Sequence, residues 1–138
     1  MQLMSSSFGH GQRIPGEFAF AVPDPVGHLR LSSNRNPHLR WSGAPSATRS
    51  LVLLCVDTDV PTRADDVNKE GRVVPADLPR TDFYHWVMVD IPPAVQEIAA
   101  GSGRPNQLGY PQVLSGMWSD GRNAHFCMVP FDLAPVPD

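Results

Sequence analysis

The segment SLVLLCVDTDVP, from Ser50 to Pro61, decides the fold because it carries two carboxylates and a proline at the end of an apolar run. The six apolar residues Leu51 to Val56 are partly β-branched and bounded by polar residues, which predicts a strand covered on both faces. Asp57 and Asp59 follow, and residues i and i+2 of an extended chain point to the same side. We therefore expect both carboxylates to line one wall of a pocket, with Pro61 ending the strand's pairing.

The partner of this segment is FYHWVMVDIP, from Phe83 to Pro92, in which His85 precedes the apolar strand Trp86 to Val89. A histidine beside aspartates can hold a small polar group, because Asp57 would orient the imidazole and favour its protonated form. The simpler alternatives are that the aspartates cap the turn after the strand and that His85 is a neutral core histidine. Trp86 is interpreted mainly as a core anchor, with stacking on a ligand as the alternative.

Four motifs at compatible spacing resemble the phosphatidylethanolamine-binding protein family, and its bacterial, Raf-kinase-inhibitor-like branch in particular. They are the D-x-D-x-P end of the first strand, the H-W opening of a strand that ends in I-P, the run FGHGQRIP from Phe8 to Pro15, and the run PHLRWSGAP from Pro37 to Pro45. The resemblance covers residues 8–98 and is weaker over residues 109–134. A single motif such as D-x-D-x-P would be weak, but four in this order are specific.

The resemblance implies a mainly β chain with an antiparallel β-sandwich-like fold, few short helices and one domain over residues 1–138. It implies binding of a small anion or a phospholipid head group, without a cofactor, and a homodimer. The ligand-binding residues carried over from the family pattern, together with those of the variable wall, are Asp57, Asp59, Pro61, His85, Trp86, Tyr110 and His125.

The family pattern changes in the C-terminal third. A glycine-rich loop of the type G-Y-x-G-P-x-P-P would begin at Gly109-Tyr110, and the family's H-R-Y strand opening is replaced by Ala124-His125-Phe126. Ala124 therefore stands where the family has its second histidine, and His125 is one position out of register. A shift of one residue reverses the face of a strand side chain. We therefore expect a site that binds its anion weakly.

The composition of the chain argues against several kinds of protein. Fifteen prolines and eleven glycines in 138 residues indicate many turns and few long helices. The net charge of −3, without a basic run, argues against nucleic acid as a partner. No apolar segment approaches the length of about 18 residues that a membrane span needs, and residues 1–7 lack a secretory signal, so we expect a cytoplasmic protein. Cys55 and Cys127 are interpreted as small buried hydrophobes, and no metal-ligand spacing occurs.

The other expected elements are short. We expect strands over Glu17 to Val22, Leu29 to Leu31 and Ala124 to Leu133, a short strand ending at Trp41, and a helical turn from Ala94 to Ala100. The polar segment from Thr62 to Asp82 is too long for a simple connection, which predicts a functional or mobile excursion. The remaining histidines, His10, His28 and His38, are interpreted as surface or turn residues.

Other function classes fit less well. Asp57 with His85 is also the orienting half of a hydrolytic triad, but the chain has no G-x-S-x-G nucleophile motif. Carboxyl groups at i and i+2 are closer together than an inverting glycosidase requires. We therefore expect a binding protein and not an enzyme. The alternatives are a protein-interaction or inhibitor module that uses residues 62–82, and a scaffold that has kept the fold but lost the pocket.

Overall fold

The computed structural model describes residues 1–67, 69–102, 112–114 and 124–131, and these form strands and one turn of 3₁₀ helix. In chain order the elements are β1 (Gln2–Met4), η1 (Gly16–Phe18), β2 (Ala21–Asp24), β3 (His28–Leu31), β4 (Leu39–Ser42), β5 (Ser50–Pro61), β6 (Arg80–Ile91), β7 (Glu97–Ile98), β8 (Gln112–Leu114) and β9 (Ala124–Phe131).

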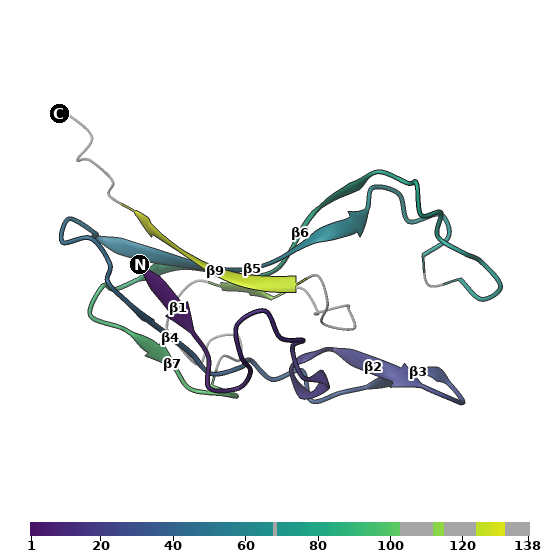
Figure 1. The fold of residues 1–138 in the computed structure, drawn as a ribbon, viewed down its shortest axis with the longest axis horizontal. Helices are drawn as coiled ribbons and strands as arrows, with labels where there is room; N and C mark the ends of the chain where they lie inside the picture. The colour runs from purple at the N-terminus through teal and green to yellow at the C-terminus, as the bar shows by residue number, and fades with distance from the viewer. Residues whose placement is uncertain (68, 103–111, 115–123, 132–138) are drawn as a thin grey trace.

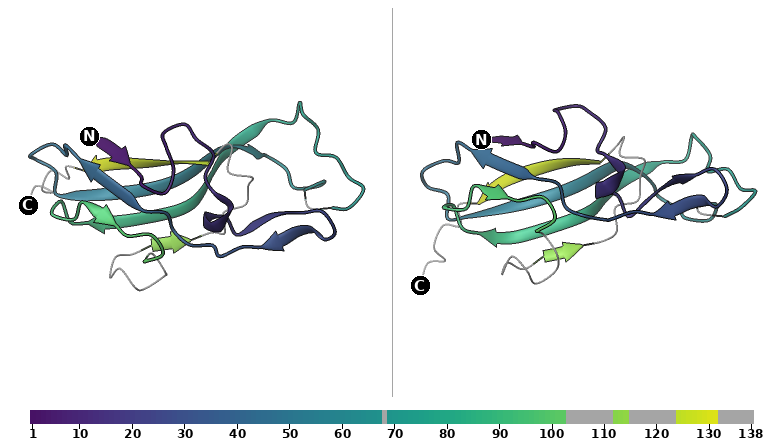
Figure 2. Two further views of the ribbon diagram at one scale, coloured as in Figure 1. Left: turned by 60° about the horizontal axis from the view of Figure 1, so that its bottom comes forward. Right: turned by 90° about the horizontal axis from the view of Figure 1, so that it is seen from below.

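The strands make two sheets and a separate hairpin. The larger sheet has the order β8-β6-β5-β9 and the smaller one the order β1-β4-β7, while β2 pairs with β3, and all these pairs are antiparallel. The two apolar runs of the sequence take the two central positions of the larger sheet. Figures 1 and 2 show the smaller sheet facing one side of the larger one. The predicted mainly β, antiparallel sandwich-like fold is therefore confirmed.

The core lies between these two layers. Alternate residues of Leu51–Cys55 and Trp86–Met88 are buried there, and Leu39 and Trp41 of β4 pack against them. The inward residues of the central strands are Leu51, Leu53 and Cys55 of β5 with Trp86 and Met88 of β6. The expectation that both faces would be covered is wrong, because the alternate residues Val52, Leu54, Val87 and Val89 are only half-buried. The small sheet packs on one face only. The Cys55 side chain is fully buried.

Two local expectations are also corrected. Residues 94–100 do not form a helical turn: Val95 closes a turn with Pro92, and Glu97–Ile98 then pairs with β4. Burial of Ile98 against the core outweighs the local helix preference. The expected strand from Glu17 to Val22 instead begins as η1, in which Phe18 and Ala19 donate to the carbonyls of Pro15 and Gly16.

Asp24 stabilises the turn between β2 and β3. Its Oδ1 accepts the amides of Val26 at 2.9 Å and Gly27 at 2.8 Å. These bonds, the one from Gly27 first, lower the pKa of the Asp24 carboxyl because they stabilise its ionised form. His28, which follows the turn, has a φ of 64°, in the left-handed region.

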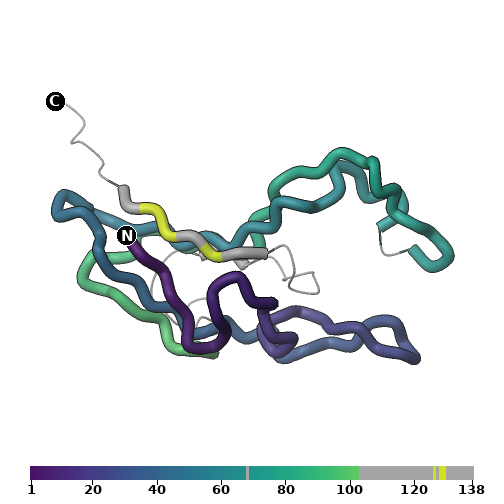
Figure 3. Tube along the Cα trace, in the orientation of Figure 1, coloured from purple at the N-terminus to yellow at the C-terminus, as the bar shows by residue number. Residues whose placement is uncertain are grey.

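Beyond the core, the outer parts of β5 and β6 continue as a two-stranded arm. Figures 1 and 3 show this arm and the β2–β3 hairpin projecting from the same end of the molecule. The predicted excursion is shorter than expected, because β6 begins at Arg80 and leaves residues 62–79 as the connection. An ion pair of 3.3 Å between His28 and Glu70 joins the hairpin to this connection. In the part of the chain that the structure describes, no helix is long and apolar enough to cross a membrane.

Candidate functional site

His85 occupies a β-bulge in the central strand β6. Cys55 pairs with Trp86 while Val56, the next residue of β5, pairs with Tyr84, so that His85 is the extra residue. A bulge breaks the alternation of a strand and re-aims one side chain. His85 and Trp86 are accordingly buried in succession, whereas Tyr84 is exposed.

Asp57 lies beside a second irregularity, this time in β5. Asp57 pairs with Phe83 and Val60 with Thr81, so β5 uses one residue more than β6 over this stretch. The amide of Asp59 donates to Oδ1 of Asp57 at 2.9 Å. The carboxylate thus holds the backbone of the irregular stretch, which is the capping role considered as the simpler alternative for it.

The two residues meet in the interior. Nε2 of His85 is 3.8 Å from Oδ2 of Asp57, and the side chains are 1% and 7% exposed. This distance exceeds a hydrogen bond but makes an ion pair when the imidazole is protonated. A buried carboxylate is costly without such compensation, so the two groups support each other. The predicted proximity of Asp57 and His85 is therefore present.

Phe83 covers the imidazole from the outer side. Its ring packs edge-on against that of His85, with centroids 5.0 Å apart and an interplanar angle of 67°. Phe83 is 40% exposed, so the ring that packs on the imidazole reaches the surface. The sequence reasoning did not include Phe83, although its position two residues before His85 was the available signal.

Asp59 does not share the interior with Asp57. Its side chain is 53% exposed, and its Oδ1 lies 3.9 Å from Nε of Arg80. Nη1 of Arg80 also donates to the Asp59 carbonyl at 3.4 Å. The expectation that both carboxylates would line one wall is wrong, because the extra residue in β5 breaks the i, i+2 relationship.

The other predicted site residues have different positions. Pro61 ends β5 in the arm, opposite Arg80. Trp86 is 2% exposed, and its ring packs edge to face on that of Phe126 with centroids 6.3 Å apart. Trp86 is therefore a core anchor.

One position of the predicted C-terminal wall, residue 125, lies in β9. Position 125 pairs with Val56, whereas position 124 pairs with Asp57. His125 is therefore one register position away from the Asp57 pairing. Tyr110 lies outside the described residues.

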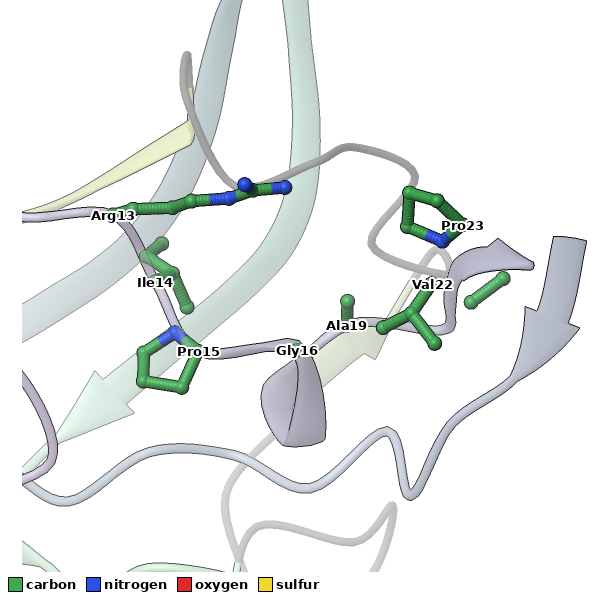
Figure 4. A pocket seen from close by; sticks show the side chains of 8 residues that line it. Arg13, Ile14, Pro15, Gly16, Ala19, Val22 and Pro23 are labelled. Carbon is green, nitrogen blue, oxygen red and sulfur yellow. The ribbon is translucent and has the colours of Figure 1, made fainter. Parts of the chain in front are cut away.

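Two hollows among the described residues lie away from this pair. One of about 280 Å³ is formed by residues around η1 and the start of β2, with Arg13 along its side (Figure 4). Another, of about 30 Å³, lies in the connection of the arm, lined in part by Asp66 and Leu78. Asp57 and His85 line neither of these two hollows. Within residues 1–67, 69–102, 112–114 and 124–131, no group of three or more potential metal ligands is found.

Comparison with known proteins gives a consistent result. The family model described as phosphatidylethanolamine-binding protein matches residues 4–128. The UPF0098 protein YbhB of Escherichia coli is 27% identical over 103 residues, which cover 75% of this chain and 51% of that protein. A UPF0098 protein of Chlamydia trachomatis is 29% identical over 102 residues, covering 74% of this chain and 53% of that protein. The chain thus spans about half the length of these curated relatives.

Two solved structures share the fold. The crystal structure of E. coli YbcL, titled a new member of the mammalian PEBP family, has a TM-score of 0.63 at 20% identity and covers 99% of this chain and 80% of that one. The phosphatidylethanolamine-binding protein homologue CT736 of C. trachomatis has a TM-score of 0.62 at 20% identity, with coverage of 99% and 78%.

Proposed function

Because the chain belongs to the phosphatidylethanolamine-binding protein family, we propose that it binds a small anion, such as phosphate or the phosphate-bearing head group of a phospholipid, beside His85. The observation that carries the proposal is the buried contact of 3.8 Å between His85 and Asp57. The Asp57 carboxylate compensates the positive charge of a protonated imidazole, and that charge attracts the anion.

Asp57 acts as a positioning residue in this proposal, not as a contact of the anion. Its Oδ1 is engaged by the Asp59 amide, and its Oδ2 faces the imidazole. The negative charge of the outer carboxylate, Asp59, is partly balanced by Arg80. The anion would approach from the side of Phe83, whose ring packs on the imidazole and is partly exposed.

Binding should be weak because one donor of the family pattern is replaced by Ala124. A missing charge-assisted hydrogen bond costs roughly 1.5 to 3 kcal/mol, or more than tenfold in affinity. Position 124 is the register partner of Asp57. Ala124→His should therefore strengthen the binding of the anion.

Calorimetric titration with sulfate at about pH 6 and about pH 8 tests the proposal, since sulfate keeps its charge while histidine changes its own. We expect tighter binding at the lower pH, no binding by His85→Gln, and gain of affinity by Ala124→His. His10→Gln is the control for a surface histidine. Equal affinity of the wild-type protein at both pH values, or unchanged affinity of His85→Gln, would overturn the proposal. A binding protein of this kind needs no catalytic nucleophile, and we propose no enzymatic activity.

A protein-interaction module is the second candidate, favoured by the arm. Val73 in the connection is 84% exposed, and Phe83 and Tyr84 add exposed apolar surface on β6. A kinase or protease regulator would use this surface. Binding to a purified partner that is lost in Val73→Ser but retained in His85→Gln would favour the interaction module over the anion site.

A further inference from the structure

His38 and the segment Ser5–Ser7 form a cluster that the anion site does not use. The Ser5 hydroxyl donates to the His38 carbonyl at 2.6 Å, and the His38 amide donates to the Ser7 hydroxyl at 2.9 Å. The Ser6 amide donates to Nδ1 of the His38 ring at 2.9 Å, and the Ser7 amide donates to Ser5 Oγ at 3.0 Å. Backbone and side chain of one histidine therefore hold three successive serines.

The opposite ring nitrogen of His38 contacts the small sheet. Nε2 lies 3.0 Å from Oε1 of Glu97 in β7, and the His38 side chain is 19% exposed. A backbone amide can only donate, so Nδ1 must accept and is without a proton. The neutral ring therefore carries its proton on Nε2 and donates it to Glu97.

This arrangement is sensitive to a second proton. A protonated imidazole has a donor on both nitrogens, so its Nδ1–H would face the Ser6 amide, which is another donor. The bond to Glu97 becomes charge-assisted and stronger. The ring then stays with Glu97, and the serine segment is the side that yields.

We propose that proton uptake by His38 releases Ser6 and loosens β1 from β4. The cluster follows β1 directly, and β1 pairs with β4 through only three residue pairs. Loosening would free one edge of β4 in the small sheet, whose order is β1-β4-β7. It would also weaken the packing of Leu3 and Phe8 on the core.

The charged groups around His38 favour this direction. Glu97 faces the ring from β7, and Arg40 of β4 is its register partner. The N-terminal segment contributes no charged side chain, since the first titratable side chain of the chain is that of His10. Histidine is the side-chain type whose charge ordinarily changes between about pH 5 and 8.

Amide hydrogen exchange on the full chain tests whether β1 loosens from β4 at low pH. It is measured at about pH 7.5 and about pH 5.5, across the range in which histidines ordinarily titrate. Rates are corrected for the intrinsic pH dependence, and the amides of β5 serve as the internal reference. Loss of one neutral hydrogen bond predicts that the protection of residues 2–4 falls about fivefold at the lower pH, with β5 unchanged. Equal protection at both pH values, or a fall shared by β5, would overturn the proposal.

The variant His38→Asn tests the role of the Nδ1 atom. His38→Asn places an amide oxygen near the position of Nδ1, so it should keep the Ser6 bond and abolish the pH dependence. His28→Asn is the matched control, because His28 pairs with Glu70 far from β1, and should leave the pH dependence intact. If the pH dependence persists in His38→Asn, the proposed role of His38 is contradicted. The ¹⁵N signals of the wild-type His38 ring give an independent check, since they should report the Nε2–H form at the higher pH.

Discussion

His85 contacts Asp57 although the register partner of Asp57 is Phe83. His85 is two residues from Phe83, so it lies diagonal to Asp57, a position from which side chains on one face of a sheet can reach each other. The bulge at His85 falls at this point of β6. Register and bulge together therefore place the imidazole beside the buried carboxylate.

Asp57 should be more important for stability than an exposed aspartate. Asp57→Ala removes the acceptor of the Asp59 amide and leaves His85 without its buried carboxylate, at a cost of about 2 to 3 kcal/mol. Asp57→Asn retains an oxygen for the amide and should cost about half as much. Urea unfolding measures both values, with Asp65→Ala as the exposed control. A cost for Asp57→Ala within the range of that control would contradict the described role.

Trp41 should tolerate loss of its indole nitrogen. Nε1 of Trp41 is buried and has no hydrogen-bond partner in the structure over the described residues. Trp41→Phe removes this unsatisfied donor together with some packing, so we expect a net cost below about 1 kcal/mol. Leu39→Ala, at an equally buried site, should cost about 2 to 5 kcal/mol because it leaves a cavity. Thermal and urea unfolding would compare the two, and a Trp41→Phe cost above 2 kcal/mol, on the order of a cavity, would indicate a bonded indole.

Removing Phe83 should open the path to His85. The ring is partly exposed and packs on the imidazole, so Phe83→Ala should cost little stability and accelerate sulfate association. Tyr84→Ala is the control from the next position, which faces the other side of the strand. Stopped-flow or NMR line-shape analysis gives the rates. Slower association or weaker binding in Phe83→Ala would show that the ring contacts the ligand and does not merely cover it.

Asp24 should tie the β2–β3 turn to acidic pH. Because the pKa of Asp24 is lowered by the Gly27 and Val26 amides, its contribution is complete above the ordinary aspartate value, about 3.9. The contribution is lost as the pH falls below that value and through the folded-state pKa. We expect the Gly27 amide signal to shift only in this acidic range, and Asp24→Asn to abolish the shift. A shift between about pH 5 and 7 would contradict this assignment, since His28 would then be the titrating group.

The sequence predicted the parts of the fold that depend on apolar runs. Leu51 to Val56 and Trp86 to Val89 are the central strands, and the four motifs identified the family. It did not predict the bulges at His85 and after Asp57, because one extra residue leaves no mark in the apolar pattern. For that reason the sequence placed Asp57 and Asp59 on one wall and did not predict the exposure of Asp59. His38 was missed because its partners, Ser6 and Glu97, are distant in sequence and carry no motif.

The most direct test of the anion site is ¹⁵N NMR of the His85 imidazole during a sulfate titration at about pH 6, where histidine is near the middle of its titration range. The account predicts a saturable shift of the His85 ring nitrogens that follows the same binding curve as the calorimetric heat. His10 and His28, on the surface, serve as reference signals in the same spectra. Unchanged His85 signals at saturating sulfate, or shifts confined to the surface histidines, would contradict the central claim that the buried pair of Asp57 and His85 binds the anion.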